Sequence, residues 1–419
     1  MKIIRYFCIM KRFKDFFITI CLVVLSSLTT YAQTQVTNES ARQTAADDIT
    51  ISLLTCSPGS QVWSLYGHTA IRFQDPAHDV DLAINYGMFN FNQKNFIARF
   101  VFGITDYEMG IEPFAFFLQE YARNGRGVIG QRLNLTTKEK EAIADALNNN
   151  YKPANRVYRY NYFYDNCTTR ARDILVNNID GRVTYDTNDA VSPSYRQMTH
   201  QWTGKHRWSQ MGNDLLLGVK ADAHTTRTQQ QFLPDTLRKD FDHAVIVAPN
   251  GTHRLLVDST YTVLQPYPSY TDTSNDIWDD ISPIMIFSTI ALLIFVLALL
   301  ELKRKKPFWF IDATLLTTDG LAGLILFAMV FSQHPTVNLN LQILLLNPLS
   351  IIFAYSIIRQ QIKGLCHWYW KVLLACLILF LLGNIFQDYA EGMNILALTL
   401  MVRCIINIKT LRTKGKQPA

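Results

Sequence analysis

The sequence predicts an α+β domain outside the cytoplasm, followed by an all-α bundle of five transmembrane helices. Hydrophobic residues make up 49% of the 419 residues, and they gather near the N-terminus and after residue 280. The stretch between these regions alternates strand-like and helix-like patterns, and basic residues recur in every second connector of the apolar C-terminal part. We therefore divide the chain into a signal peptide (1–32), an extracytoplasmic domain (33–280) and a transmembrane domain (281–419).

The first 32 residues have the pattern of a secretory signal peptide. The basic segment KRFKDFF precedes an apolar core, and Thr30 and Ala32 supply the small residues of a cleavage site before Gln33. An uncleaved signal anchor is the alternative, because the length of the apolar core fits both. Either arrangement places the residues that follow on the far side of the membrane.

Five apolar runs follow residue 280, and each is long enough to cross a hydrocarbon layer of ~30 Å as a helix. They lie near 283–300, 308–331, 339–358, 368–387 and 393–408. The connectors KRKK and RQQIK and the tail KTLRTKGK are basic, whereas SQHPTVN and QDYAEG contain no Lys or Arg. Since basic connectors face the cytoplasm, this alternation predicts a cytoplasmic C-terminus.

The formal net charge of +6 therefore reflects membrane topology and does not indicate a nucleic-acid partner. The sequence has no P-loop, no glycine-rich nucleotide fingerprint and no G-x-S-x-G motif. His200 and His206 are widely spaced and lack a nearby cysteine or carboxylate at ligand spacing. We expect neither a cofactor nor a metal. Asp312, Asp319 and Arg403 lie in apolar runs, where polar residues face the bundle interior or helix ends, so transport ranks low.

Local patterns in the extracytoplasmic domain predict the elements in order. ITISLLTC is typical of a buried strand, HTAIRFQD alternates as a second strand, and VDLAINYGMFNF continues as a third. Thr136 and Glu139 form a capping box that opens a helix to about residue 149. Asn166 is a good N-cap for the helix CTTRARDILVNN, and HAVIVAPNGTHRLLVDSTYTVL predicts a hairpin around Asn250-Gly251.

Cys56 and Cys167 are the two cysteines of this domain, and two interpretations stand for them. In an oxidising compartment they permit a disulfide. Alternatively, Cys167 is the first residue of its helix, where unpaired N–H groups and the macrodipole favour a thiolate. The same N–H groups suit an oxyanion on a carbonyl under attack.

A cysteine nucleophile needs a base, and the base needs a third group that orients it. His68, in WSLYGHTAIRF, lies where a turn enters a strand, and Gly67 permits close approach of another backbone. Asn85, in INYG, falls on the neighbouring predicted strand within reach of the imidazole. The alternatives are a hydrogen-bonded surface histidine and a turn or sheet-edge asparagine.

The order GHTAIRF, INYG, NC resembles circularly permuted papain-like thiol enzymes, including the lecithin retinol acyltransferase group. More closely, WSLYGHTAIRF, INYGMFNF, NCTTRARDIL and FLPDTL resemble the N-terminal periplasmic domain of the Lnb lipoprotein N-acyltransferase family of Bacteroidota, which also has a C-terminal membrane bundle. The motifs that carry the resemblance lie between about residues 50 and 245. The order of a periplasmic domain and a membrane bundle extends it to the whole chain. It implies Cys167 as nucleophile and His68 as base. Asn85 matches no assigned family position and stays a geometric candidate.

The resemblance also implies a reaction and a place. An acyl chain would move from a membrane phospholipid, through a cysteine thioester, to the α-amine of a diacylglyceryl-cysteine lipoprotein. The enzyme would lie in the bacterial inner membrane with its first domain in the periplasm. Two alternatives remain: a membrane-anchored cysteine peptidase or amidase that cuts cell-wall peptides, and a non-enzymatic receptor with a Cys56–Cys167 disulfide.

Overall fold

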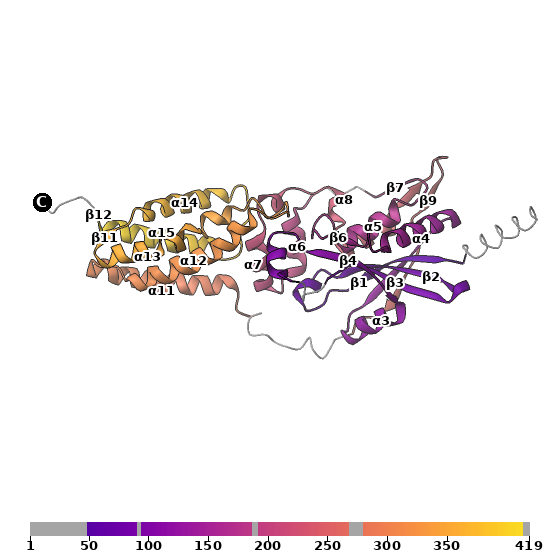
Figure 1. Ribbon diagram of the computed structural model, residues 1–419, viewed down its shortest axis with the longest axis horizontal. Helices are drawn as coiled ribbons and strands as arrows, with labels where there is room; N and C mark the ends of the chain where they lie inside the picture. The colour runs from indigo at the N-terminus through magenta and orange to yellow at the C-terminus, as the bar shows by residue number, and fades with distance from the viewer. Residues whose placement is uncertain (1–47, 90–93, 187–191, 268–279, 414–419) are drawn as a thin grey trace, which may run out of the picture.

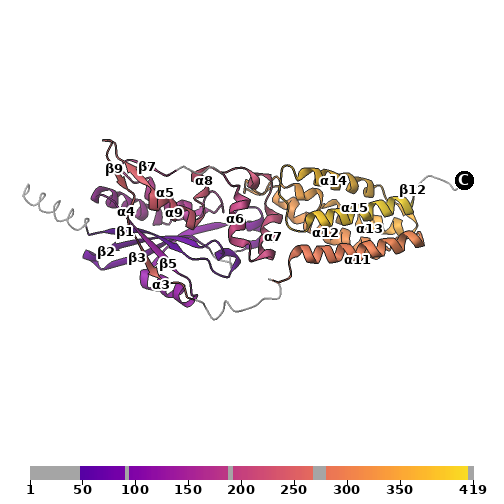
Figure 2. The same cartoon turned by 180° about the vertical axis from the view of Figure 1, so that it is seen from behind.

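The computed structural model describes residues 48–89, 94–186, 192–267 and 280–413. It is elongated, with a sheet-containing domain at one end and a helical bundle at the other (Figure 1). Between them lie α6 (Tyr195–Thr203) and α7 (Arg207–Leu216), and the view from behind shows the same order (Figure 2). The predicted signal peptide lies outside the described residues.

One antiparallel sheet of seven strands, in the order β10-β5-β1-β2-β3-β4-β6, forms the centre of the first domain. The strands are β1 (Thr50–Cys56), β2 (His68–Asp75), β3 (Val80–Met88), β4 (Asp106–Pro113), β5 (Val128–Leu133), β6 (Val157–Arg159) and β10 (Val257–Leu264). The register places His68 opposite Cys56 and Asn85 opposite Ala70. His68 and Asn85 therefore lie on adjacent central strands.

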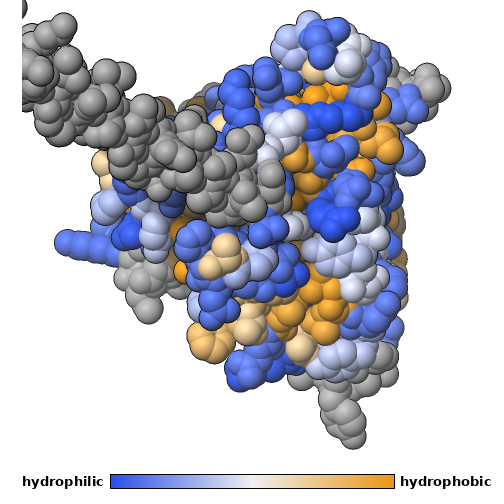
Figure 3. Space-filling model, turned by 90° about the vertical axis from the view of Figure 1, so that its right-hand side faces the viewer, coloured by the Kyte–Doolittle hydropathy of each residue, from blue (hydrophilic) through white to orange (hydrophobic). Residues whose placement is uncertain are grey.

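Helices cover both faces of this sheet. One face packs against α4 (Thr137–Tyr151), α5 (Cys167–Val176) and α9 (Pro234–His243), through a core that includes Leu53 and Ile71. The other face packs against α3 (Phe114–Arg123), through Leu54 and Ala70. Alternate residues of β1 and β2 thus serve different cores, as the two-residue period of a strand requires. The end of this domain away from the bundle is mostly hydrophilic, with narrower hydrophobic areas (Figure 3).

The structure confirms the locally encoded elements. The three predicted strands are β1, β2 and β3. Thr136 and Glu139 form the predicted capping box of α4, and the side chain of Asn166 caps α5 by accepting from the N–H groups of Thr168 and Thr169. Cys167 is the first residue of α5, as predicted.

The predicted hairpin around Asn250-Gly251 is only partly right. β8 (Val245–Val247) and β9 (His253–Leu255) form it and join β7 (Arg182–Thr184) in a small second sheet. The segment after Leu256 leaves the hairpin and becomes β10, which pairs with β5 in the large sheet. Leu256 is fully buried, and its N–H donates to the carbonyl of Ala244, so the chain changes sheets at an anchored residue.

Helices form at each of the five predicted apolar runs. They are α11 (Pro283–Arg304), α12 (Trp309–Met329), α13 (Leu349–Ile362) preceded by the short η5 (Leu341–Leu344), α14 (Tyr369–Gly383) and α15 (Met393–Thr410). In the described part of the chain, four segments are long and apolar enough to cross a membrane: α11, α12, η5 with α13, and α15. The fifth, α14, has 15 residues, so five membrane crossings remain a prediction.

The bundle interior holds a cluster of three charged side chains, which we call the bundle cluster: Glu301, Asp312 and Arg403. Arg403 bonds both carboxylates, with Nε 2.7 Å from Asp312 Oδ1 and Nη2 3.0 Å from Glu301 Oε1. All three are almost completely buried. Asp312 and Arg403 therefore face the interior, as expected for polar residues in apolar helices.

A hydrophobic cluster, which we call the junction core, joins the two parts of the molecule. It contains Leu65 and Tyr66 from the turn before β2, and Phe163 from the loop before α5. Met329, at the end of α12, and Val337, in the following loop, pack into the same cluster. The bundle therefore supports the two segments that carry His68 and Cys167.

Candidate active site

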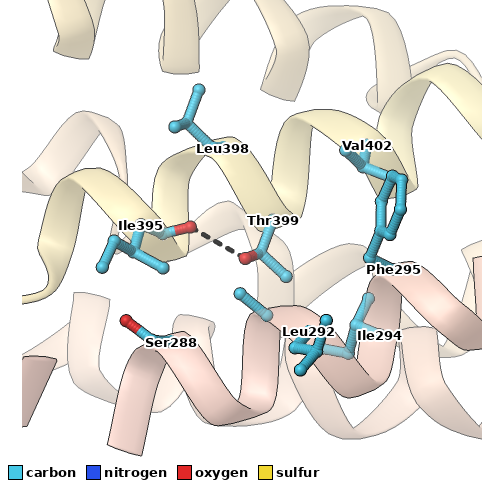
Figure 4. Close-up of a pocket in the computed structure, with 9 residues that line it drawn as sticks. Ser288, Leu292, Ile294, Phe295, Ile395, Leu398, Thr399 and Val402 are labelled. Atoms are coloured by element: carbon cyan, nitrogen blue, oxygen red, sulfur yellow. Dashed lines mark hydrogen bonds between the residues drawn. The ribbon is translucent and has the colours of Figure 1, made fainter. Parts of the chain in front are cut away.

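Cys167, His68 and Asn85 line one cavity of about 320 Å³ in the sheet domain. Its wall also carries aromatic residues, including Tyr107 and Tyr160. A second hollow, of about 440 Å³, lies between α11 and α15 in the bundle (Figure 4). Among the described residues, none that lines this hollow has an ionisable side chain. The candidate catalytic residues line the first cavity.

Asn166 fixes the position of the cysteine. Its Oδ1 accepts from the backbone N–H groups of Thr168 and Thr169, both at 2.9 Å. Its Nδ2 donates to the carbonyls of Tyr162 and Phe232, at 3.0 and 2.8 Å. A buried side chain with this many partners holds the helix start in one position against the loop before it and the segment before α9.

Two glycines let the backbone reach this geometry. Gly67 has φ +80°, and a Cβ there would lie 2.6 Å from the Cys56 carbonyl oxygen. Gly87, at a bulge in β3, has φ +83°, which side-chain-bearing residues rarely adopt. The Cβ position of Gly87 lies 3.6 Å from Cys167 Cβ, so α5 begins directly over this bend.

His68, Asn85 and Glu112 form a chain of hydrogen bonds. The Nδ2 of Asn85 lies 2.9 Å from Glu112 Oε1, and since a carboxylate accepts, Nδ2 is the donor. The Oδ1 of Asn85 consequently faces His68 Nε2, at 3.0 Å, and accepts a hydrogen bond from the Nε2–H group. This tautomer leaves Nδ1 as the basic nitrogen of the neutral imidazole.

His68 and Cys167 line the same cavity, and each changes the pKa of the other. Burial raises the pKa of the Cys167 thiol, but the imidazolium charge, its hydrogen bond, and bonds from the Thr69 N–H and the Thr168 hydroxyl outweigh burial and lower it to about 7. Burial lowers the pKa of His68, but the thiolate and the Asn85 hydrogen bond raise it above its ordinary value. The pair therefore favours thiolate and imidazolium together.

Cys56 differs from Cys167 although it lies opposite His68 in the sheet. Both cysteines are free thiols in the structure. Burial raises the pKa of Cys56 to about 12, and Cys56 packs in the same buried cluster as Tyr121. An inert buried thiol of this kind packs like a small hydrophobic residue.

Other histidines of the domain lie apart from the thiol. His78 pairs with Asp75 at an exposed turn, with Nδ1 2.7 Å from Oδ2. His200 bonds Asp214 with Nε2, at 2.9 Å. His206 precedes α7 at its N-cap. Among the described residues, no group of three or more His, Cys, Asp or Glu side chains is placed to hold a metal ion.

The structure adds residues that the sequence analysis did not single out. Glu112 holds Asn85, and its assignment requires the β3–β4 register, which no local pattern reveals. Thr168 Oγ1 accepts a hydrogen bond from Thr69 Oγ1, at 3.1 Å, and so keeps its own hydrogen for the sulfur, 3.8 Å away. Thr69 follows His68 in GHTAIRF, and Thr168 follows Cys167 in NCTTRARDIL. Their places in these two motifs are the sequence signal that could have identified them.

Comparison with known proteins gives two family matches. Residues 37–201 match the Lnb N-terminal periplasmic domain, and residues 272–414 match the Lnb transmembrane domain. No curated protein and no solved structure matches the chain. The likeness to permuted papain-like enzymes therefore stays a prediction.

The two matches follow each other along the chain in the order of the sheet domain and the helical bundle. The protein is thus a membrane protein with a periplasmic domain N-terminal to its transmembrane domain. It belongs to the Lnb family.

Proposed function

We propose that this protein is a lipoprotein N-acyltransferase of the bacterial inner membrane, with Cys167 as the nucleophile, His68 as the base and Asn85 as the residue that orients His68. The observation that carries the proposal is the placement of Cys167, His68 and Asn85 in one cavity, with His68 hydrogen-bonded to Asn85, in a domain supported by a membrane bundle. The family matches favour this role over others. The C-terminus would lie in the cytoplasm, as the basic connectors predict.

In the first half-reaction, His68 Nδ1 accepts the thiol proton, and the Cys167 sulfur attacks an ester carbonyl of a phospholipid. The Cys167 N–H, at the start of α5, suits the oxyanion that forms. As the carbon–oxygen ester bond breaks, His68 gives its proton to the departing lysophospholipid oxygen. The products are an acyl thioester on Cys167 and a lysophospholipid.

In the second half-reaction, the α-amine of a diacylglyceryl-cysteine lipoprotein attacks the thioester. Neutral His68 takes a proton from the attacking nitrogen, the carbon–sulfur bond breaks, and the proton returns to the sulfur. An amide forms on the lipoprotein, and the thiol is regenerated. A thioester suits a reaction in two halves, because it reacts with amines but persists between the two steps where water is excluded.

Mass spectrometry of the intact protein after exposure to phospholipid vesicles tests the proposal. We expect one added acyl chain on Cys167, which disappears when a diacylglyceryl lipopeptide is supplied and reappears on the amine of that peptide. A protein that stays unmodified with phospholipid but cleaves cell-wall peptides would instead support the peptidase alternative. The receptor alternative requires a Cys56–Cys167 disulfide, which a non-reducing digest would detect.

A further inference from the structure

An apolar surface on the sheet domain lies directly above the bundle. The short helix α2 (Phe96–Val101) exposes Ile97 to 78% and Phe100 to 47%. A six-residue helix that presents such side chains to water is unfavourable unless something covers them. Figure 1 shows that the sheet domain and the bundle lie end to end, with α12 running up to the junction.

The position of α2 places this surface at the membrane boundary. Val101 packs against the junction core, which also contains Met329 of α12. The carbonyl of Phe102 accepts from the N–H of Gln333, at 2.9 Å, in the loop after α12. At that end of α12, Phe331 is 64% exposed, as expected for a side chain that faces lipid. The exposed residues of α2 therefore continue the apolar surface of a transmembrane helix.

A row of aromatic rings connects α2 with the cysteine, and we call it the aromatic track. It consists of Phe100, Phe96, Phe89, Tyr107 and Tyr160. The ring centroids are 6.4 Å apart for the first pair, then 6.2, 5.1 and 4.2 Å for the following pairs. Each ring thus contacts the next, from the membrane end of the domain inward.

The inner end of the aromatic track reaches the catalytic cavity. Phe89, Tyr107 and Tyr160 all line the cavity that contains Cys167. Tyr160 lies 3.8 Å, and Cys167 3.6 Å, from the same point above Gly87. A hydrocarbon chain that lies along these rings would contact aromatic side chains at each step from α2 to the cavity of Cys167.

We propose that α2 dips into the outer surface of the membrane and that the aromatic track carries one acyl chain of a phospholipid from the bilayer to Cys167. The inference rests on the proposed function and adds the route of the donor. A phospholipid is favoured over a peptide because the surface is apolar and continuous with a lipid-facing helix. Three of the five rings of the track are phenylalanines, and the other two are tyrosines.

The test uses full-length protein in vesicles of phosphatidylethanolamine and phosphatidylglycerol. Cys167 is blocked as a mixed disulfide, and a phosphine reductant, tris(2-carboxyethyl)phosphine, starts the reaction without adding a thiol that could accept the acyl group. Two rates are measured by intact mass: acylation of Cys167 by the vesicle phospholipid, and acylation by a soluble short-chain ester, p-nitrophenyl acetate. The variants are Ile97→Asp and Phe100→Asp. The matched control is Phe116→Asp, since Phe116 is also 64% exposed but lies on α3, away from the bundle.

We expect both α2 variants to slow acylation by vesicle phospholipid by at least about tenfold, because a carboxylate resists the interface. Their reaction with the soluble ester should stay within about twofold of wild type, and Phe116→Asp should change neither rate. Normal phospholipid acylation in both α2 variants overturns the inference. So does an equal loss with both esters, which would show that α2 only supports the fold. If wild-type Cys167 is not acylated by phospholipid at all, the proposed function itself fails.

Discussion

The bundle cluster and the catalytic cavity are both buried and polar, but they use their polar groups differently. Every carboxylate oxygen of Glu301 and Asp312 has a hydrogen-bond partner inside the protein. In the cavity, Cys167 and His68 are paired with each other but border open space. Charged side chains whose hydrogen-bond partners all come from the protein stabilise one arrangement of helices. A pair of ionisable side chains beside a cavity can still interact with a substrate that enters the cavity.

Replacing the nucleophile should have the largest effect. We expect Cys167→Ser to lower lipoprotein acylation by at least about 10³-fold, because a hydroxyl has a far higher pKa than a thiol and His68 cannot readily ionise it. Circular dichroism should show an unchanged fold. Cys56→Ala is the matched control and should keep near-normal activity, with a stability loss of about 1–2 kcal/mol. Near-normal turnover of the serine variant would remove Cys167 from the mechanism.

Breaking the bundle cluster should affect stability and leave the chemistry intact. Arg403→Met leaves two buried carboxylates without a counter-charge, at a cost of about 3–5 kcal/mol. Thermal unfolding in detergent would measure this loss. The triple variant that adds Glu301→Gln and Asp312→Asn should recover most of it. A cluster with a transport role would instead lose function in the triple variant while its stability returned.

Removing the base should change both a rate and a pH dependence. The pKa of Cys167 is lowered to about 7, so alkylation by iodoacetamide should fall as the pH drops below 7 and the thiolate is protonated. In His68→Gln this limb should move up toward the ordinary value of 9.0, since the imidazolium no longer favours the thiolate. Thioester formation should slow by roughly 10²-fold. His200→Gln, which alters a histidine paired with Asp214, is the control and should leave both the limb and the rate unchanged.

The orienting residue should have the smallest effect of the four. Asn85→Ala removes the acceptor of the Nε2 proton, so the imidazole no longer has a fixed tautomer, and we expect a loss of roughly tenfold in acylation rate. The thiolate limb should stay closer to 7 than in His68→Gln, because the imidazole is still present. Single-turnover acylation across pH would measure both quantities. An Asn85→Ala variant as slow as His68→Gln would show that Asn85 does more than orient the ring.

The features that the sequence predicted correctly depend on local chemistry. Asn166 is a strong N-cap, and the apolar spacing after Cys167 is helical, so the start of α5 could be placed to the residue. The alternation of HTAIRFQD placed His68 at the start of a strand, next to the strand that carries Asn85. The position of Asn85 followed from these two strands.

The features that were missed depend on long-range pairing. β5 lies between β1 and β10, which are distant in sequence, and β4 contains Gly110 and Pro113, which weaken a strand pattern. Glu112 could not be linked to Asn85 without the bulge at Gly87, which sets the register of β3 and β4. The route of Leu256 between two sheets is likewise set by tertiary packing.

The junction core also determines when during synthesis the site can be completed. A chain emerges from its N-terminus, so His68 and Cys167 reach the periplasm before Met329 and Val337 have been translated. The turn at Tyr66 and the loop at Phe163 acquire their last packing partners only after the bundle has inserted. The segments that carry His68 and Cys167 therefore gain their full packing only at the membrane, and we expect a chain whose insertion stalls to lack this support.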